Sequence, residues 1–253
     1  MSPLVISLLA CALMLLGAVA GARLRRSLPD HHLDERTKEI VRLGAGLIAA
    51  ISAVMLGFLI NSASITFTAQ RVQVERVAAD LILLDHMLDG FGPEARPVRV
   101  LMRQGVDELV RHVWPADGGT PPPEPRMAPG SIGAQAFVDI SSLKAENPKQ
   151  RALQTQAIQV AMDIARARLT LFEMAQVPTP WPIVAVLVFW FISLFASFCL
   201  FTPLNATGVG ALVVMALSLS AALFLYLEMG QAFSGLMRIS SESIATVLPP
   251  LSP

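Results

Sequence analysis

The sequence has little charge. Only 15% of its 253 residues are Asp, Glu, Lys or Arg, against about 25% in an ordinary soluble domain. No charged residue lies in residues 1–22, 43–70 or 177–227. A soluble domain would interleave charged positions with its core, so this segregation excludes an ordinary soluble fold and indicates a membrane protein. The formal net charge is zero, so there is no overall basic field and we expect no nucleic-acid partner.

Cysteine is also scarce. Cys11 and Cys199 both lie in apolar runs, where they give no sign of a disulfide framework and are best read as small packing residues. The sequence also lacks a glycine-rich phosphate loop, cysteine pairs at metal spacing and a nucleophile–base arrangement. We therefore expect no enzymatic activity and no cofactor.

Long apolar runs are plentiful. A helix needs about 20 apolar residues to cross a bilayer, and residues 3–22, 43–64, 181–201 and 208–228 meet this requirement. The expected fold is an all-α membrane protein with four transmembrane helices, since an exposed backbone amide is costly in lipid. The first run could also be a cleaved signal peptide, but its arginines follow the apolar core instead of preceding it, which favours a retained helix.

The basic residues predict an orientation. The short loop 23–42 holds six of them, whereas the N-terminal tail and the loop between the last two spans hold none. The positive-inside rule then places loop 23–42 in the cytoplasm of a multi-pass inner-membrane protein, with both termini and the segment 65–180 outside. Small residues at Gly17 and Gly21, and at Ala49, Ala53 and Gly57, predict close packing between the spans.

The segment 65–180 is expected to be an extramembrane helical stalk. The helix of the second span should continue until Gly90–Pro93, and further helices are predicted over 94–114 and 149–176. Their seams could bury against one another or against a neighbouring subunit. Residues 115–133 are too rich in Pro and Gly for a regular element; they are either a mobile insertion or a polyproline-type recognition motif. The seam of the first stalk helix is Val74, Val77, Leu81, Leu84 and Leu88.

The two adjacent histidines of loop 23–42 are candidates for a metal site. His31 and Glu35 lie one helical turn apart, with His32 beside them. Zinc, however, requires three or four converging ligands. The histidine pair could alternatively sense pH, and the simplest interpretation is a solvated connector that faces lipid headgroups.

Few polar side chains lie within the spans. Glu228, at the end of the fourth span, is interpreted as an interfacial anchor or helix-end residue and less readily as an ion relay. Asn205–Thr207 match a glycosylation acceptor, although capping of the fourth span is the simpler role. The remaining polar residues either bond between helices or line a narrow path; they are Asn61, Ser193, Ser197, Ser218 and Ser220.

Four stretches together resemble a known family: RRSLPDHHL, LLDHMLDGFGPEA, VFWFISLFASFCLFTPLNAT and YLEMGQAFSGLMRISS. Their order and spacing are similar to the bacterial membrane-protein family labelled bestrophin-like, a domain of unknown function, over nearly the whole chain. The family-motif residues are Arg25, Arg26, Pro29, His32, Leu84, Asp85, Gly92, Pro93, Glu94, Glu228, Phe233 and Gly235.

The sequence departs from the family pattern at two positions of the last motif. Gly230 stands where the family has an aspartate, and Ala232 stands where it has a proline. The loss of half of the acidic pair argues against ion or proton handling there. The family name suggests anion channels, in which subunits with four membrane helices form a ring around one pore and keep both termini and the large middle domain in the cytoplasm. That orientation is opposite to the one predicted from the basic residues.

Two functional hypotheses follow. The first is a non-enzymatic membrane scaffold, or an envelope or stress-linked protein, whose stalk binds a protein partner. The alternative is an oligomeric bestrophin-like anion channel with a central pore. Because a 27.1 kDa subunit with four spans is too small to enclose a pore alone, we expect a homo-oligomer in the lipid bilayer.

Overall fold

The computed structural model describes residues 2–27, 35–114, 132–175, 180–201, 205–233, 235–240 and 244, without the side chains of 112–113, 132 and 172–175. Every regular element in these ranges is a helix, and four of the helices are long and apolar enough to cross a membrane. The expected all-α membrane fold is therefore confirmed. The chain divides into unit 1, Met1–Thr66 with Pro178–Gly230, and unit 2, Phe67–Val177 with Gln231–Pro253.

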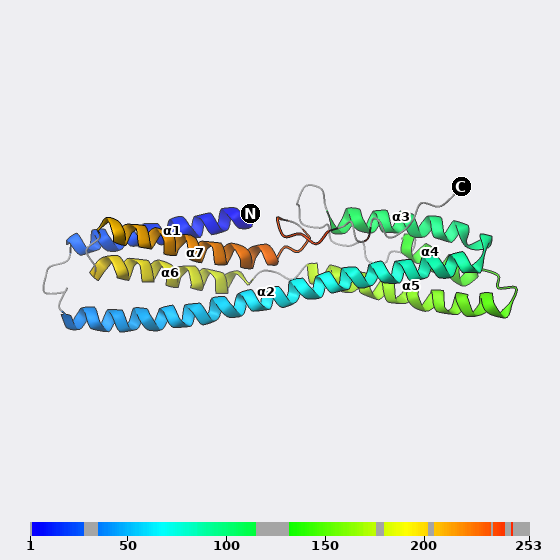
Figure 1. Ribbon diagram of the computed structural model, residues 1–253, viewed down its shortest axis with the longest axis horizontal. Coiled ribbons are helices and arrows are strands. Elements are labelled where there is room, and N and C mark those ends of the chain that lie inside the picture. Colours follow the sequence, from blue (N-terminus) through cyan, green and yellow to red (C-terminus); the bar gives the residue numbers. More distant parts are fainter. Residues whose placement is uncertain are drawn as a thin grey trace. The chain divides into compact units, whose positions relative to one another are not determined.

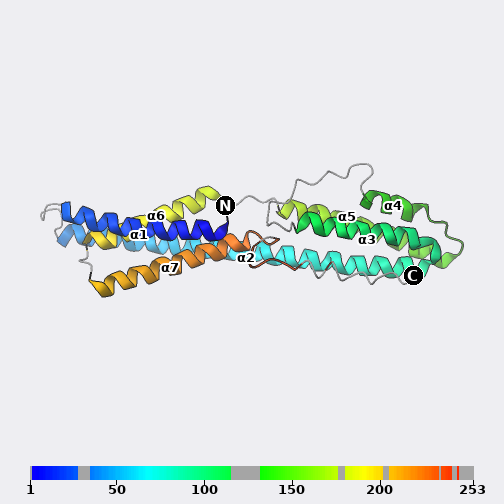
Figure 2. The ribbon, with the colours of Figure 1, turned by 90° about the horizontal axis from the view of Figure 1, so that it is seen from above.

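Unit 1 is a bundle of apolar helices. It contains α1 (Pro3–Ser27), α6 (Trp181–Phe201), α7 (Ala206–Met229) and the first part of α2 (Glu35–Phe91), which run alongside one another in Figures 1 and 2. The bundle is stabilised mainly by close packing, because lipid is as apolar as the helix surfaces. Its most deeply buried side chains include Met14, Leu187 and Leu223.

Two glycines of α1 allow that helix to approach α6 closely. A Cβ atom added at Gly21 would lie 2.1 Å from the backbone oxygen of Ala196, and one at Gly17 would lie 2.9 Å from the backbone oxygen of Ile192. Neither position can therefore hold a larger residue without separating the helices. In contrast, Gly57 of α2 has open space at its Cβ position.

A side-chain cap marks the start of α7, and a glycine marks the end of α2. Asn205 is the N-cap of α7, and its side chain accepts a hydrogen bond from the Gly208 amide at 2.9 Å. The capping role expected of Asn205 is thus confirmed. α2 ends at Phe91, and Gly92 then takes a φ of 126°, which favours glycine. The 3₁₀ turn Pro93–Ala95 follows, and α3 (Arg96–Val113) begins directly after it.

Unit 2 is a second helical bundle with its own core. The later part of α2 packs with α3, α4 (Ile132–Ser142) and α5 (Pro148–Ala175). All five seam residues of the first stalk helix are buried, with 0–4% of their surface exposed. They lie in one cluster with Val98 of α3 and Leu171 of α5. The seams therefore bury against one another within one chain, which resolves the alternative that the sequence left open.

The helix α4 was not predicted. Its first residues, Ile132 and Gly133, belong to the segment that the sequence assigns to a Pro- and Gly-rich loop, so that loop boundary is wrong; residues 115–131 lie outside the described ranges. The physical reason lies in α5. The Gln154 side-chain amide donates to the carbonyls of Ile140 and Leu143 at 2.9 Å each, so the next helix satisfies carbonyls at the C-terminal end of α4.

Candidate functional site

The residues proposed for a metal site are only partly described. His31, His32 and Pro29 lie outside the described ranges. The Glu35 carboxylate accepts a hydrogen bond from Lys38 Nζ at 2.8 Å, and this bond lowers the pKa of Glu35 below its usual value. Among the described residues, no three His, Cys, Asp or Glu side chains are grouped for metal binding. The metal and pH-sensing hypotheses for this loop remain predictions.

The arginines of the first motif lie at the end of a helix. Arg25 and Arg26 occupy the last turn of α1, where cations interact favourably with the helix dipole. The Arg25 side chain is half-buried and that of Arg26 is exposed. This arrangement fits a helix that ends at a membrane surface.

The second motif contains an ion-paired cluster that connects α2 to α3. Arg99 donates from Nε and from Nη2 to the two carboxylate oxygens of Asp85, both at 2.8 Å, and from Nη1 to Asp89. The side chains of Asp85 and Arg99 are only 7% and 14% exposed. The Asp85 hydrogen bond is the main cause that raises the pKa of Arg99, so the guanidinium stays charged.

The other residues of the second motif shape the turn that brings this pair together. Leu84 is buried in the core of unit 2, one position before Asp85. Pro93 occupies the start of the 3₁₀ turn, and Glu94 is exposed beside it. A Cβ added at Gly92 would lie 2.8 Å from the Glu94 carboxylate. These features explain the motif as a structural corner between two helices.

The residues after α7 are anchored to α3 in unit 2. The Phe233 ring packs edge-on against Trp114, with 5.4 Å between the ring centroids. Trp114 Nε1 donates to the Ile239 carbonyl at 2.7 Å, and the Ile239 amide donates to the Ala232 carbonyl at 2.8 Å. Gly235, with a φ of 101°, lies in the turn between them. The family motif in the sequence includes Phe233 and Gly235 but not Trp114, for which the only signal is an aromatic residue at the predicted helix end.

Glu228 lies in a different environment from the one expected. Its side chain belongs to unit 1 and is only 2% exposed, so the expectation that it reaches outward to the membrane interface is wrong. The neighbouring residues Tyr226 and Leu227 are buried with it, because the last turn of α7 packs into the core of unit 1. Glu228 and Phe233, although close in sequence, belong to different units.

Most polar side chains of the spans are satisfied by backbone groups. Ser193, Ser197 and Ser218 each donate to the carbonyl four residues earlier in their own helix, at 2.8–2.9 Å. Ser220 donates to the Ser7 carbonyl at 2.6 Å and so links α7 to α1. Asn61 instead lies on an exposed part of α2. Of the five polar candidates, only Ser220 therefore makes the expected bond between helices within the described structure.

The fold and these contacts define a class: a multi-span helical membrane protein with a second helical unit, which is formed by the later part of α2, by α3, α4 and α5, and by the residues that follow α7. Comparison with protein families assigns the chain within this class. The model of the Bestrophin-like domain matches residues 11–244, and the chain belongs to this family. No curated protein and no solved structure matches the chain.

Proposed function

We propose that this protein is a non-enzymatic membrane scaffold that assembles as a homo-oligomer through the membrane-spanning part of α2. The proposed location of the protein is the inner membrane. In such an assembly each subunit presents its helical unit 2 to a partner protein outside the bilayer. The observation that carries the proposal is a stripe of small residues on the exposed face of α2.

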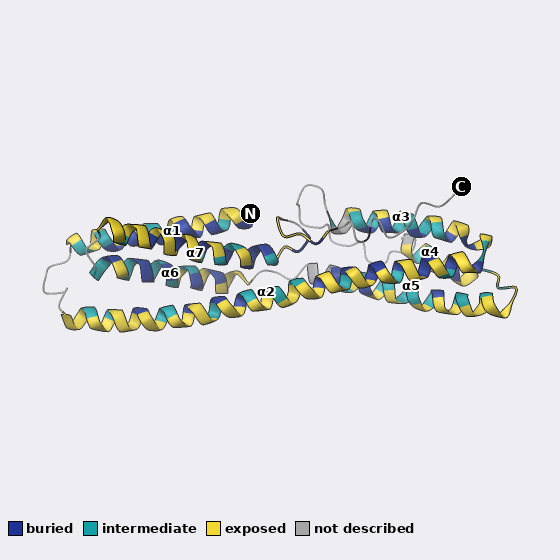
Figure 3. Cartoon of the chain, in the orientation of Figure 1, coloured by how far each residue is buried: buried dark blue, intermediate teal, exposed yellow. Residues whose placement is uncertain are grey.

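This α2 stripe consists of Gly46, Ala50, Ala53, Gly57 and Asn61, all exposed and separated by steps of four, three, four and four residues. Such spacing keeps the five residues on one face of a helix. Figure 3 shows how much of the surface of this part of α2 is exposed. Small residues allow membrane helices to approach closely, as Gly17 and Gly21 already do for α1 and α6.

The polar groups of unit 1 favour a scaffold over a pore. The hydroxyls of Ser193, Ser197 and Ser218 are bonded to their own helices, and that of Ser220 is bonded to α1. Side chains used in this way are poorly placed to replace the hydration shell of an ion. Glu228 is buried within its own subunit, where it does not supply a ring of charge around a shared axis.

One observation favours the second candidate, an anion channel with a central pore. Asn61 lies on the α2 stripe and offers an amide donor toward a neighbouring subunit or a shared axis. If several copies arranged their α2 stripes around one axis, Asn61 would form a polar ring at the end of the span. The two candidates share the same interface and differ in whether the axis conducts.

The mass of the detergent-solubilised protein, corrected for bound detergent, tests the shared interface. We expect a homo-oligomer, and we expect Gly57→Leu to shift it toward the monomer because leucine separates facing helices. Gly210→Leu is the matched control, since Gly210 of α7 also has open space at its Cβ position but lies outside the stripe. A monomeric wild-type protein, or equal effects of the two variants, would contradict the proposal.

Anion flux in liposomes then separates the two candidates. A scaffold predicts no flux above that of empty liposomes for the wild-type oligomer. Flux that Asn61→Leu abolishes while the oligomer persists would instead establish the channel.

A further inference from the structure

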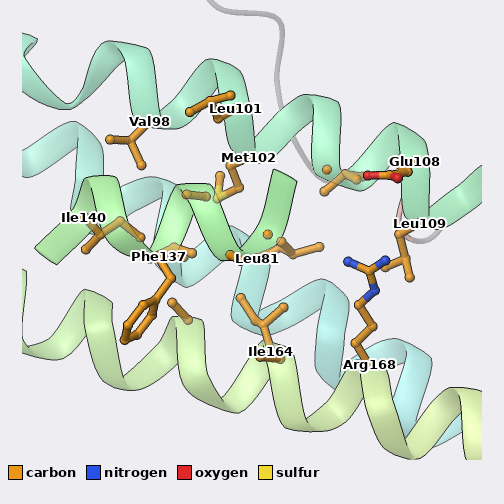
Figure 4. A pocket seen from close by; sticks show the side chains of 18 of the residues that line it. Leu81, Val98, Leu101, Met102, Glu108, Leu109, Phe137, Ile140, Ile164 and Arg168 are labelled. Carbon is orange, nitrogen blue, oxygen red and sulfur yellow. The ribbon is translucent and has the colours of Figure 1, made fainter. Parts of the chain in front are cut away.

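Unit 2 contains a cavity of about 120 Å³ between α2, α3, α4 and α5 (Figure 4). Protein interiors are normally packed as densely as organic crystals, with few voids larger than a water molecule. The cavity is partly open to the surface, since its lining residues Phe137 and Leu169 are exposed, so it is a pocket that a molecule can enter and not a sealed void. Most of its wall is apolar, and the larger side chains that form it include Leu81, Met102, Leu109, Phe137, Ile140 and Ile164.

Small residues on three helices leave this space open. Gly105 of α3, Ala134 and Ala136 of α4, and Ala161 and Ala165 of α5 all line the cavity. Leucine at any one of the alanine positions would occupy much of the volume. The short helix α4 covers one side, where the buried Ile140 and the partly exposed Phe137 line the cavity (Figure 4).

Two charged residues lie at one end of the cavity, and the opposite end is apolar. Glu108 lies on α3, and Arg168 extends from α5 in the direction of α3 (Figure 4). A Cβ added at Gly133 would lie 3.6 Å from Arg168 Nη1, so the guanidinium also passes close to the start of α4. A guanidinium presents a fork of donors that matches a carboxylate. The cavity thus combines apolar walls with a group that can bind an anion.

We propose that this cavity binds a single-chain amphiphile with an anionic head group, of the fatty-acid class. The carboxylate binds Arg168 and part of the alkyl chain fills the apolar space. An apolar cavity of about 150 Å³ is large enough for benzene, so 120 Å³ accommodates a short stretch of chain while the rest emerges. The membrane that the protein spans is a local source of such molecules. Each methylene group buried strengthens binding about fourfold.

Photolabelling of the full-length protein in lipid nanodiscs tests this proposal. The probe is dodecanoic acid that carries a diazirine in its chain, and mass spectrometry locates the labelled residues. We expect labelling on the cavity-lining faces of α4 and α5. Unlabelled dodecanoate should compete better than dodecan-1-ol or dodecylamine, because only dodecanoate offers a carboxylate to Arg168.

Matched variants distinguish cavity binding from labelling of the surface. Ala161→Leu should reduce labelling about tenfold, whereas Ala152→Leu, the same change at an exposed position of α5, should leave it unchanged. Ala165→Leu serves as a second filling variant, and a retained melting temperature shows that each variant folds. Arg168→Gln should weaken competition by dodecanoate about tenfold and spare that by dodecan-1-ol. Arg166→Gln alters an exposed arginine on the same helix. It should change neither the competition by dodecanoate nor that by dodecan-1-ol.

Three results would overturn the proposal. The first is labelling confined to the membrane helices of unit 1. The second is cavity labelling that persists in both folded filling variants. The third is stronger competition by dodecylamine than by dodecanoate, which would assign the head-group site to Glu108 and a cation.

Discussion

At the scale of single residues, Arg99 contributes more to unit 2 than any charge pattern in the sequence indicates. Its guanidinium satisfies both carboxylate oxygens of Asp85 in a largely buried environment. Removing one partner of a buried pair leaves the other charge without compensation, which costs about 3–5 kcal/mol. Because Arg99 retains some solvent contact, we predict that Arg99→Met lowers the free energy of unfolding by about 2–4 kcal/mol. Denaturant unfolding followed by near-UV circular dichroism measures the change.

Two further variants test the cause of that loss. Arg166→Met removes an exposed pair with Asp163 and should cost less than about 1 kcal/mol. Asp85→Leu combined with Arg99→Met removes both buried charges and should recover part of the stability. If the double variant loses as much free energy of unfolding as Asp85→Leu and Arg99→Met lose in sum, uncompensated charge is not the cause of the instability.

The sequence identified one half of this pair and not the other. Asp85 was singled out because it belongs to a family motif, whereas Arg99 lies 14 residues later, beyond the turn at Gly92. Spacing along a helix predicts pairs three or four residues apart. A pair across a helical corner depends on how the corner folds, and no local pattern in the sequence reports that.

At the scale of elements, the close contact of α1 with α6 depends on Gly21. Its Cβ position lies 2.1 Å from a backbone oxygen, which cannot rotate away as a side chain can. We predict that Gly21→Ala lowers the melting temperature in detergent and costs about 1–3 kcal/mol, the usual penalty of overpacking. Gly210→Ala, in open space on α7, should be neutral or slightly stabilising, because alanine is the better helix former. Equal changes in melting temperature for the two variants would show that helix propensity, and not the contact between α1 and α6, determines the effect of alanine.

Long elements with regular periodicity were predictable, and the short one was not. The seam of α2 follows from apolar residues at steps of three and four, and all of them are buried. Helix α4 has only 11 residues, too few to be stable alone. It depends on contacts with α3 and α5 and on the Gln154 amide at its end. The cavity that α4 closes was equally invisible in the sequence, since a void follows from the meeting of small residues on different helices.

At the scale of the whole molecule, the contacts of Trp114 establish a topological relation. Trp114 lies between α2 and α6 in sequence, and its partners Phe233 and Ile239 follow α7. Since these residues touch within unit 2, we predict that the segment after α2 and the segment after α7 lie on the same side of the membrane. This prediction requires an even number of membrane crossings between the two segments, which one crossing each by α6 and α7 would provide.

The contacts predict this relation, and the distribution of basic residues predicts which side of the membrane unit 2 occupies. Residues 23–42, predicted as a loop, comprise the end of α1, the connection and the start of α2; they hold six basic residues, and short basic connections between spans stay in the cytoplasm. We therefore predict that unit 2 faces the outside.

A membrane-impermeant maleimide should label Ser141→Cys in intact spheroplasts and should label Thr37→Cys only after permeabilisation; both positions are exposed. The native Cys11 and Cys199 are buried, so the wild-type protein supplies the background. The reverse pattern would place unit 2 in the cytoplasm, the orientation that the channel hypothesis requires. In that case the basic loop would have been overruled by the folding of the rest of the chain.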